Sequence, residues 1–191
     1  MEIIKIEDVF GELAELETPR LLLRKFKAED AADMFEYASD EETAKYVTWS
    51  PHRTIEDSRG FIDLVLGKYA AREVAEWGVV LKENGKFIGT CGYVWWKPGH
   101  AKAEIGYALS RKYWGRGLMS EALAAVMAFG FDKMRLQRLE LQCMPENIGS
   151  EKVMLKNGLK LEGVLRDVIY AKGTFQTLKL YSILRSEYRP A

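Results

Sequence analysis

The sequence predicts a mixed α/β (α+β) domain built on a twisted, mostly antiparallel sheet of about seven strands with one central parallel pair. Short apolar runs with strand character first form a meander and then alternate with segments of helical periodicity, an order found in α/β and α+β domains. Within residues 103–144 a strand, a glycine loop, a helix and a second strand follow one another. Such a βαβ unit makes its two strands parallel neighbours, and we expect helices on both faces of the sheet.

Length and composition favour a single domain over residues 1–191. The chain has 191 residues, of which 48% are apolar. A chain of this length is long enough for one well-buried core and rather short for two. Lysine plus arginine and aspartate plus glutamate each number 28, so no overall charge attracts the protein to nucleic acid or to an anionic membrane. We therefore expect neither as a partner.

The N-terminus and the cysteines are typical of a cytoplasmic protein. Residues 1–17 mix acidic side chains into apolar positions, and no segment has the roughly 18 apolar residues of a membrane span. Cys91 and Cys143 lie in separate strand-like runs rather than at CxxC spacing, which argues against a zinc site and a thioredoxin-type pair. We expect reduced cysteines and no bound metal.

The first third of the chain alternates one strand with two helices. Apolar spacing predicts a strand at 20–26 and helices at 27–39 and 54–70, with Thr54 as an N-cap. The segment between the helices, 45–52, carries aromatic residues and is expected to be a loop.

A hairpin follows in residues 73–96. Asn84-Gly85 separates two apolar runs and favours a type I′ turn. The remaining elements are a strand at 101–110, a helix at 118–131, a strand at 136–144, a helix at 147–158, and two strands within 159–185 that turn near Lys172-Gly173.

Two glycines precede the helix at 118–131. Gly115 and Gly117 allow the backbone to approach an anion at a helix N-terminus, and Arg116 and Lys112 add positive charge. Taken alone, this pattern fits a simple turn equally well. A dinucleotide fingerprint is excluded because Ser120 stands where a third glycine or alanine is required, and no P-loop string is present.

Three ordered segments together are more specific. The stretches AEIGYALSRKYWGRGLMSEAL (103–123), LELQCMPENIGSEKVMLKNGLKLEGVLRD (139–167) and the earlier ETPRLLLRKFKAEDAADMF (17–35) resemble the GCN5-related N-acetyltransferase (GNAT) superfamily. The similarity is greatest to the branch that includes the ribosomal-protein N-terminal (alanine/serine) acetyltransferases, and it covers residues 18–186. The resemblance implies a GNAT fold with two parallel strands that splay apart, acetyl-CoA as cosubstrate and an amine acceptor. The oligomeric state is open between a monomer and a homodimer.

The resemblance also implies which residues bind acetyl-CoA. Backbone amides of the loop hold the pyrophosphate, and the backbone near Ala108 and Leu109 pairs with the pantetheine, near which the Asn147 side chain is expected. Asn147 is also a good N-cap for the helix that follows. The family pattern has Gln or Arg at the first loop position, where this chain has Lys112. The implied loop residues are Lys112, Trp114, Gly115, Arg116, Gly117 and Leu118.

Glu104 is the candidate general base. A carboxylate in an otherwise apolar strand is costly unless it has a partner or a use, so a salt bridge is the alternative. Glu104 shares one face of its strand with Gly106 and Ala108, which leaves room for a slender ligand. By resemblance Glu104 takes the amine proton through water, and Ser150 protonates the leaving thiolate, a role for which Tyr170 competes.

The acceptor is less constrained than the cofactor. Deprotonating a lysine amine (pKa about 10.4) at pH 7 costs roughly 4 to 5 kcal/mol, whereas an N-terminal α-amine (pKa about 7.7 to 8.0) costs about 1. An N-terminal α-amine is therefore the easier acceptor, and the resemblance implies the N-terminus of a ribosomal protein. The alternatives are a small-molecule amine, such as a polyamine, antibiotic or amino acid, and a non-catalytic acyl-CoA-binding module.

Aromatic side chains are candidates for the acceptor groove. Adjacent Trp95 and Trp96 must face opposite sides of their strand. Ordinary packing beneath a loop explains these aromatics equally well. The substrate-binding candidates are Tyr46, Trp49, Trp95 and Tyr170.

Overall fold

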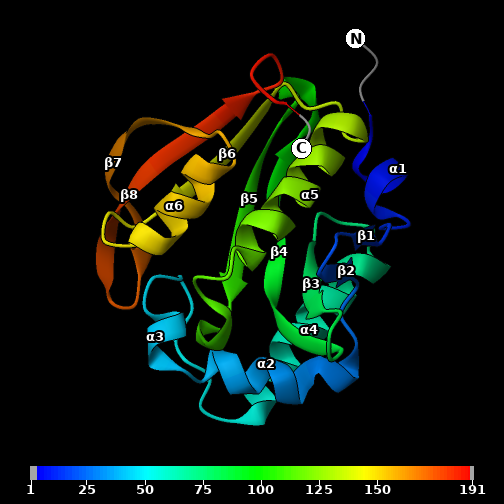
Figure 1. Ribbon diagram of the computed structural model, residues 1–191, viewed down its shortest axis with the longest axis vertical. Helices are drawn as coiled ribbons and strands as arrows, with labels where there is room; N and C mark the ends of the chain where they lie inside the picture. The colour runs from blue at the N-terminus through cyan, green and yellow to red at the C-terminus, as the bar shows by residue number, and fades with distance from the viewer. Residues whose placement is uncertain (1–3, 190–191) are drawn as a thin grey trace.

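The computed structural model describes residues 4–189 and contains one eight-stranded sheet (Figure 1). The strand order is β1-β2-β3-β4-β5-β6-β8-β7, and all neighbours are antiparallel except β5 and β6. The expected fold class is thus confirmed, with the two-residue β1 as a strand beyond the expected seven. The strands are β1 (Leu16–Glu17), β2 (Leu21–Arg24), β3 (Glu76–Leu81), β4 (Lys86–Lys97), β5 (Lys102–Leu109), β6 (Arg138–Cys143), β7 (Lys160–Ala171) and β8 (Thr174–Leu184).

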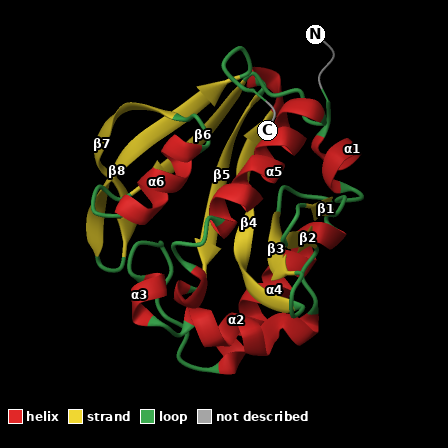
Figure 2. Cartoon of the chain, in the orientation of Figure 1, coloured by secondary structure: helices red, strands yellow, loops and turns green. Residues whose placement is uncertain are grey.

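Helices cover both faces of the sheet, as expected. Figure 2 shows α5 and α6 in front of the sheet and α4 behind β3 and β4. On the α5 face, the buried Tyr93 of β4 donates a hydrogen bond to the Val126 carbonyl at 2.7 Å. On the other face, Phe87 of β4 stacks on Tyr37 of α2. The helices are α1 (Ile6–Phe10), α2 (Ala31–Ala38), α3 (Glu41–Ala44), α4 (Ile55–Ala70), α5 (Leu118–Asp132) and α6 (Ile148–Lys156).

The parallel strands β5 and β6 pair over only a short length. Their register joins Lys102 to Arg138, Ala103 to Leu139 and Glu104 to Glu140, and ends there, although β5 continues to Leu109 and β6 to Cys143. Figure 1 shows the two strands moving apart below this point. The backbone that follows Glu104 on β5 therefore borders a gap in the sheet on the side toward β6.

One turn differs from the prediction. Gly85 has a φ of +71°, but Asn84 keeps a negative φ, and the loop from 82 to 85 has four residues between the paired Leu81 and Lys86. The expected type I′ turn at Asn84-Gly85 is therefore wrong, because that turn needs a positive φ at both central residues.

The β7–β8 hairpin has the type I′ turn geometry that was expected at Asn84-Gly85. Lys172 and Gly173 have φ values of +53° and +81° between the paired residues Ala171 and Thr174. Positive φ at both central positions is the type I′ signature. The predicted turn near Lys172-Gly173 is thus confirmed.

Val94 is an extra residue in β4. Tyr93 pairs with Ile105 and Trp95 with Glu104, so Val94 forms a bulge. The bulge sets Trp95 directly opposite Glu104, while the next residue, Trp96, is buried.

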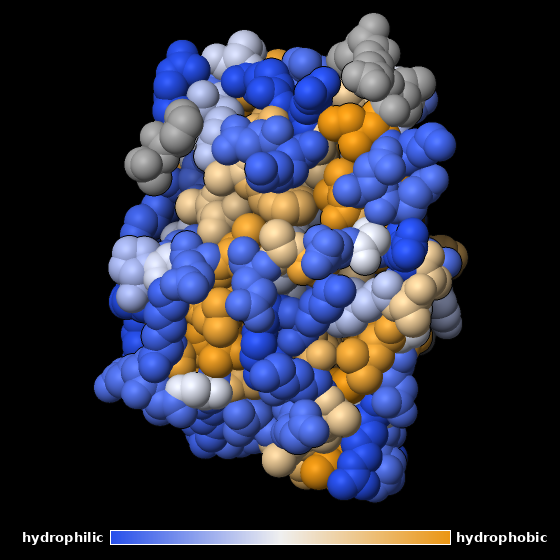
Figure 3. All heavy atoms as spheres, turned by 90° about the vertical axis from the view of Figure 1, so that its right-hand side faces the viewer, coloured by the Kyte–Doolittle hydropathy of each residue, from blue (hydrophilic) through white to orange (hydrophobic). Residues whose placement is uncertain are grey.

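The N-terminal segment belongs to the same core as the sheet. The buried Phe10 of α1 packs against Tyr93 and Trp96, with ring centroids 6.1 and 6.2 Å apart. On the face that carries α1, β1 and β2, separate hydrophobic patches lie between hydrophilic side chains (Figure 3). Within residues 4–189, no helix has the length and apolar character needed to cross a bilayer.

Candidate active site

Glu104 lies where the pairing of β5 with β6 ends. Its side chain is half-buried, and Oε2 accepts hydrogen bonds from Trp95 Nε1 at 3.0 Å and from Gln142 Nε2 at 3.1 Å. Burial raises the pKa of the Glu104 carboxyl, and the Glu140 carboxylate adds to this, while the two donors lower it. No cation among residues 4–189 forms a salt bridge with Glu104. A carboxyl group with a raised pKa is suited to accept a proton near neutral pH.

Tyr107 and Ser150 face each other from β5 and α6. Tyr107 Oη and Ser150 Oγ are 2.8 Å apart. Asn147 is the N-cap of α6, and its Oδ1 accepts a hydrogen bond from the Ser150 N–H at 3.0 Å. The N-cap interpretation of Asn147 is therefore confirmed, and this cap fixes Ser150 in the first turn. Burial raises the pKa of the Tyr107 hydroxyl, which keeps the phenol neutral.

The glycine loop requires the left-handed backbone conformation twice. Gly115 and Gly117 both have a φ of +74°, which favours glycine strongly. Gly117 is the N-cap of α5, and the first helical hydrogen bond runs from Glu121 N–H to its carbonyl at 3.1 Å. The amides of residues 118–120 thus precede the hydrogen-bonded ladder. A Cβ built on Gly115 would meet nothing within 4 Å, so the loop is open to a ligand on this side.

Two cations that the sequence reasoning missed flank this loop. Arg20 Nη2 and Lys156 Nζ each lie 3.7 Å from the position that a Cβ on Gly117 would occupy. Arg20 is held in place because it donates to Glu121 Oε2 at 2.7 Å and to the Arg116 carbonyl at 2.9 Å. The start of α5, with Lys156 and the Glu121-paired Arg20 beside it, has the backbone donors and positive charge that suit a phosphate group.

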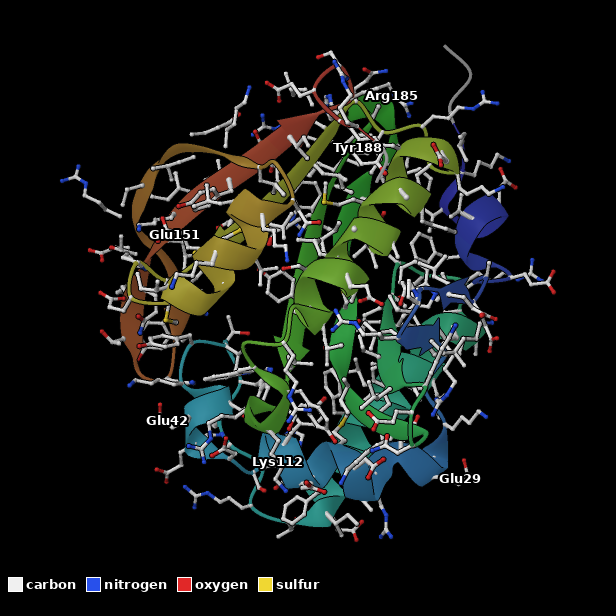
Figure 4. All side chains as sticks on the ribbon, in the orientation of Figure 1. Glu29, Glu42, Lys112, Glu151, Arg185 and Tyr188 are labelled. Carbon is white, nitrogen blue, oxygen red and sulfur yellow. The ribbon has the colours of Figure 1, made fainter. Side chains whose placement is uncertain are left out.

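The other predicted loop residues attach the loop to its surroundings. Lys112 forms an ion pair with Glu36 of α2, at the lower edge of the molecule (Figure 4). Trp114 donates its indole N–H to the Leu109 carbonyl at 2.7 Å, while Leu118 is buried beneath the start of α5. These contacts fix the loop between β5 and α5.

Of the aromatic candidates, Trp49 borders a cavity and Tyr46 lies in the same loop. The cavity has a volume of about 50 Å³ and lies on the side of β5 that carries Ala108. Lys45 places its ammonium group 5.4 Å from the Tyr46 ring centroid. The cavity is lined by Trp49 and Ala108 together with Met34, Tyr37, Ala38, His52, Phe61 and Thr90.

Tyr170 lies apart from Glu104, at the tip of the β7–β8 hairpin. It is 65% exposed and packs edge-on against Phe175, with ring centroids 5.1 Å apart. At the same tip, Lys172 donates hydrogen bonds to the carbonyls of Ala44 and Lys45, at the C-terminal end of α3. The hairpin is thus attached to the segment that leads into the loop at 45–52.

Tyr107 and Gln142 are further polar groups of the site that sequence reasoning missed. Gln142 carries only a weak signal, because β6 reads Arg-Leu-Glu-Leu-Gln-Cys and a glutamine fits this alternation of polar and apolar residues. Tyr107 carries none, because a tyrosine in a strand is ordinary. The described residues 4–189 contain no cluster of three or more His, Cys, Asp or Glu side chains that could hold a metal ion.

Comparisons with known proteins agree with this geometry. Residues 20–160 match the family described as acetyltransferase (GNAT) domain. The uncharacterized N-acetyltransferase p20 of Bacillus licheniformis is 35% identical over 173 residues, which cover 91% of this chain and 97% of the relative. The ribosomal-protein-serine acetyltransferase of Escherichia coli is 31% identical over 111 residues, which cover 58% of this chain and 62% of the relative.

Solved structures share the fold. The acetyltransferase (GNAT family) from Bacillus anthracis superposes with a TM-score of 0.81 at 31% identity, covering 91% of this chain and 100% of that one. The ribosomal L7/L12 alpha-N-protein acetyltransferase RimL, solved in complex with coenzyme A, has a TM-score of 0.78 at 19% identity and covers 90% and 98% of the two chains. With the family match spanning most of its length, this chain belongs to the GNAT family of N-acetyltransferases.

Proposed function

We propose that this N-acetyltransferase moves the acetyl group of acetyl-CoA to a protein N-terminal α-amine, with Glu104 as the general base. The observation that carries the proposal is the half-buried Glu104 carboxyl with its raised pKa, located where β5 and β6 separate. The gap that begins there is bordered by the backbone of β5, which leads toward the glycine loop at the start of α5. One end of the gap thus offers a base and the other an anion site.

The residues present fit acetyl-CoA. The amides of residues 118–120, with Arg20 and Lys156 beside Gly117, suit a pyrophosphate. The β5 backbone beyond Glu104 lacks a strand partner on the β6 side, so its polar groups are available to the amides of a pantetheine arm. When bound, acetyl-CoA supplies the acetyl thioester that the amine attacks.

Two side chains then handle protons. Glu104 accepts a proton from the acceptor amine, directly or through one water molecule. Ser150, fixed by the Asn147 cap and hydrogen-bonded to Tyr107, donates a proton to the departing thiolate. The chain contributes position and proton transfer and forms no covalent intermediate.

An α-amine suits this site better than a lysine side chain. Its pKa of about 7.7 to 8.0 leaves about 1 kcal/mol to be supplied at pH 7, against roughly 4 to 5 kcal/mol for lysine. The Escherichia coli relative is named for acetylating a ribosomal-protein serine, which supports a protein N-terminus as the acceptor class.

An acceptor panel tests the proposal. Purified enzyme is mixed with acetyl-CoA and either peptides with free N-termini, the same peptides N-terminally blocked but containing lysine, or small amines, and CoA release is followed. Free N-terminal peptides should give the highest kcat/KM, with mass spectrometry locating the acetyl group on the α-amine. Faster turnover of polyamines or amino acids would assign the enzyme to small molecules instead.

A further inference from the structure

We propose that Trp95 and Gln142 are positioning residues that hold the Glu104 carboxylate by Oε2 and leave Oε1 as the oxygen that receives the proton. The inference rests on the proposed role of Glu104 as general base and goes beyond it by assigning the two oxygens different tasks.

The two donors reach Glu104 from both flanking strands. Trp95 lies directly opposite Glu104 on β4, where the bulge at Val94 sets it, and its indole N–H donates at 3.0 Å. Gln142 lies on β6 beyond the last parallel pair, and its amide donates at 3.1 Å. Both hydrogen bonds end on Oε2, so turning the carboxylate by a quarter turn about its Cγ–Cδ bond would break both contacts.

Oε1 remains available. It accepts no hydrogen bond from the part of the chain that the structure describes, and it is not among the buried polar atoms that lack a partner. It therefore retains access to solvent and to an incoming amine or bridging water. A base must have such an accessible, oriented lone pair.

The surrounding charges act on this arrangement from three strands. The ammonium groups of Lys97 on β4 and Lys102 on β5 lie 5.2 and 5.5 Å from the Trp95 ring centroid. Cation–π attraction to these two groups helps to hold the indole ring in place. Glu140 of β6 faces Glu104 and opposes its ionisation, but it is itself paired with Lys102 and Arg138. The neutral donors Trp95 and Gln142 are thus the side chains that directly stabilise the ionised base.

If Trp95 and Gln142 position the base, removing either of them changes the pH dependence of kcat/KM, which a purely structural role would not do. Each donor favours ionised Glu104 and lowers its pKa, so removing either donor must raise that pKa. The acid limb of kcat/KM reports the ionisation of the free enzyme's base. The limb should therefore move to higher pH, by about half to one pH unit for each donor removed.

Trp95→Phe and Gln142→Met test the proposal separately. Each keeps most of the side-chain volume and deletes one N–H donor. Trp96→Phe is the matched control, because the Trp96 indole N–H is buried and has no hydrogen-bond partner among residues 4–189. Circular dichroism and CoA titration calorimetry establish folding and cofactor binding for each variant, and Glu104→Gln reports on the base itself.

The expected result is an acid limb shifted upward in Trp95→Phe and Gln142→Met, with at least a threefold loss of kcat, and an unmoved limb in Trp96→Phe. If Glu104→Gln loses turnover while neither donor variant shifts the limb relative to Trp96→Phe, the positioning role is wrong and the base assignment stands. If Glu104→Gln keeps the wild-type kcat and pH profile, the proposed base itself is wrong. A shift seen in one donor variant restricts the role to that donor.

Discussion

The hydroxyls of Tyr107 and Ser150 are 2.8 Å apart and link β5 to α6 beyond the point where β5 and β6 stop pairing. β6 does not pair with β5 at the level of Tyr107, because the register between the two strands ends at Glu104 and Glu140. The two hydroxyls consequently form a connection across the part of the sheet that we assign to the cofactor.

Ser150→Ala should lower kcat by about 10²-fold, at the lower end of the range for a general acid, because a thiolate leaves more readily than most groups. Tyr107→Phe removes one hydrogen bond to Ser150 and should cost roughly 2- to 10-fold. Steady-state kinetics at saturating acetyl-CoA measure both. A larger loss in Tyr107→Phe than in Ser150→Ala would indicate that Tyr107, rather than Ser150, supplies the proton.

Glu104→Gln should stabilise the fold at pH 7. The pKa of Glu104 is raised in the folded protein, so folding favours the protonated form, and the wild-type free energy of unfolding falls as pH rises from the ordinary glutamate pKa through the raised value. Above this window the wild type carries a half-buried charge that the glutamine variant lacks. Denaturant titrations at pH 7 and pH 4 should show the advantage of the variant shrinking at the lower pH. An advantage that grows on acidification would contradict the raised pKa.

The sequence predicted the backbone of this site better than its side-chain contacts. The strand, loop and helix from 103 to 131 follow from local signals, because apolar periodicity and glycine preference act over a few residues. Trp95 was expected to line the acceptor groove, which stays a prediction, whereas its hydrogen bond to Glu104 was not foreseen. That contact depends on the bulge at Val94, which changes the register without any local sequence signal.

Long-range pairing explains the remaining omissions. Gln142 reaches Glu104 across the parallel pair, and Arg20, just before β2, reaches the glycine loop from 96 positions earlier. Such contacts are set by strand order, which periodicity does not reveal. The turn at Asn84-Gly85 illustrates the opposite case: the dipeptide preference is genuine, but a four-residue loop overrode it.

The glycine loop should depend on backbone conformation more than on Arg116. Gly115 and Gly117 both have a φ of +74°, and a side chain in this conformation costs roughly 1 to 2 kcal/mol before any contact with the ligand. Gly117→Val should therefore weaken CoA binding by at least 10-fold, while Arg116→Ala should weaken it less than fivefold. Calorimetric Kd values in the reverse order would refute backbone-mediated binding.

Lys172 should affect the acceptor and not the cofactor. Its ammonium group joins the β7–β8 tip to the carbonyls of Ala44 and Lys45, beside the loop that carries Tyr46 and Trp49. Hydrogen bonds to charged groups contribute about 1.5 to 3 kcal/mol, so Lys172→Met should release the tip and raise the peptide KM several-fold. CoA affinity should be unchanged, and a loss of CoA affinity equal to the change in KM would indicate general unfolding.

Single-turnover acetylation of an N-terminal peptide by Glu104→Gln, with acetyl-CoA pre-bound, tests the assignment of the base most directly. General-base catalysis contributes about 10²- to 10⁴-fold, so the transfer rate at pH 7 should fall by at least 10²-fold while the Kd for CoA stays within a factor of three of the wild-type value. A transfer rate within threefold of the wild type, at equal cofactor occupancy, would contradict Glu104 as the general base.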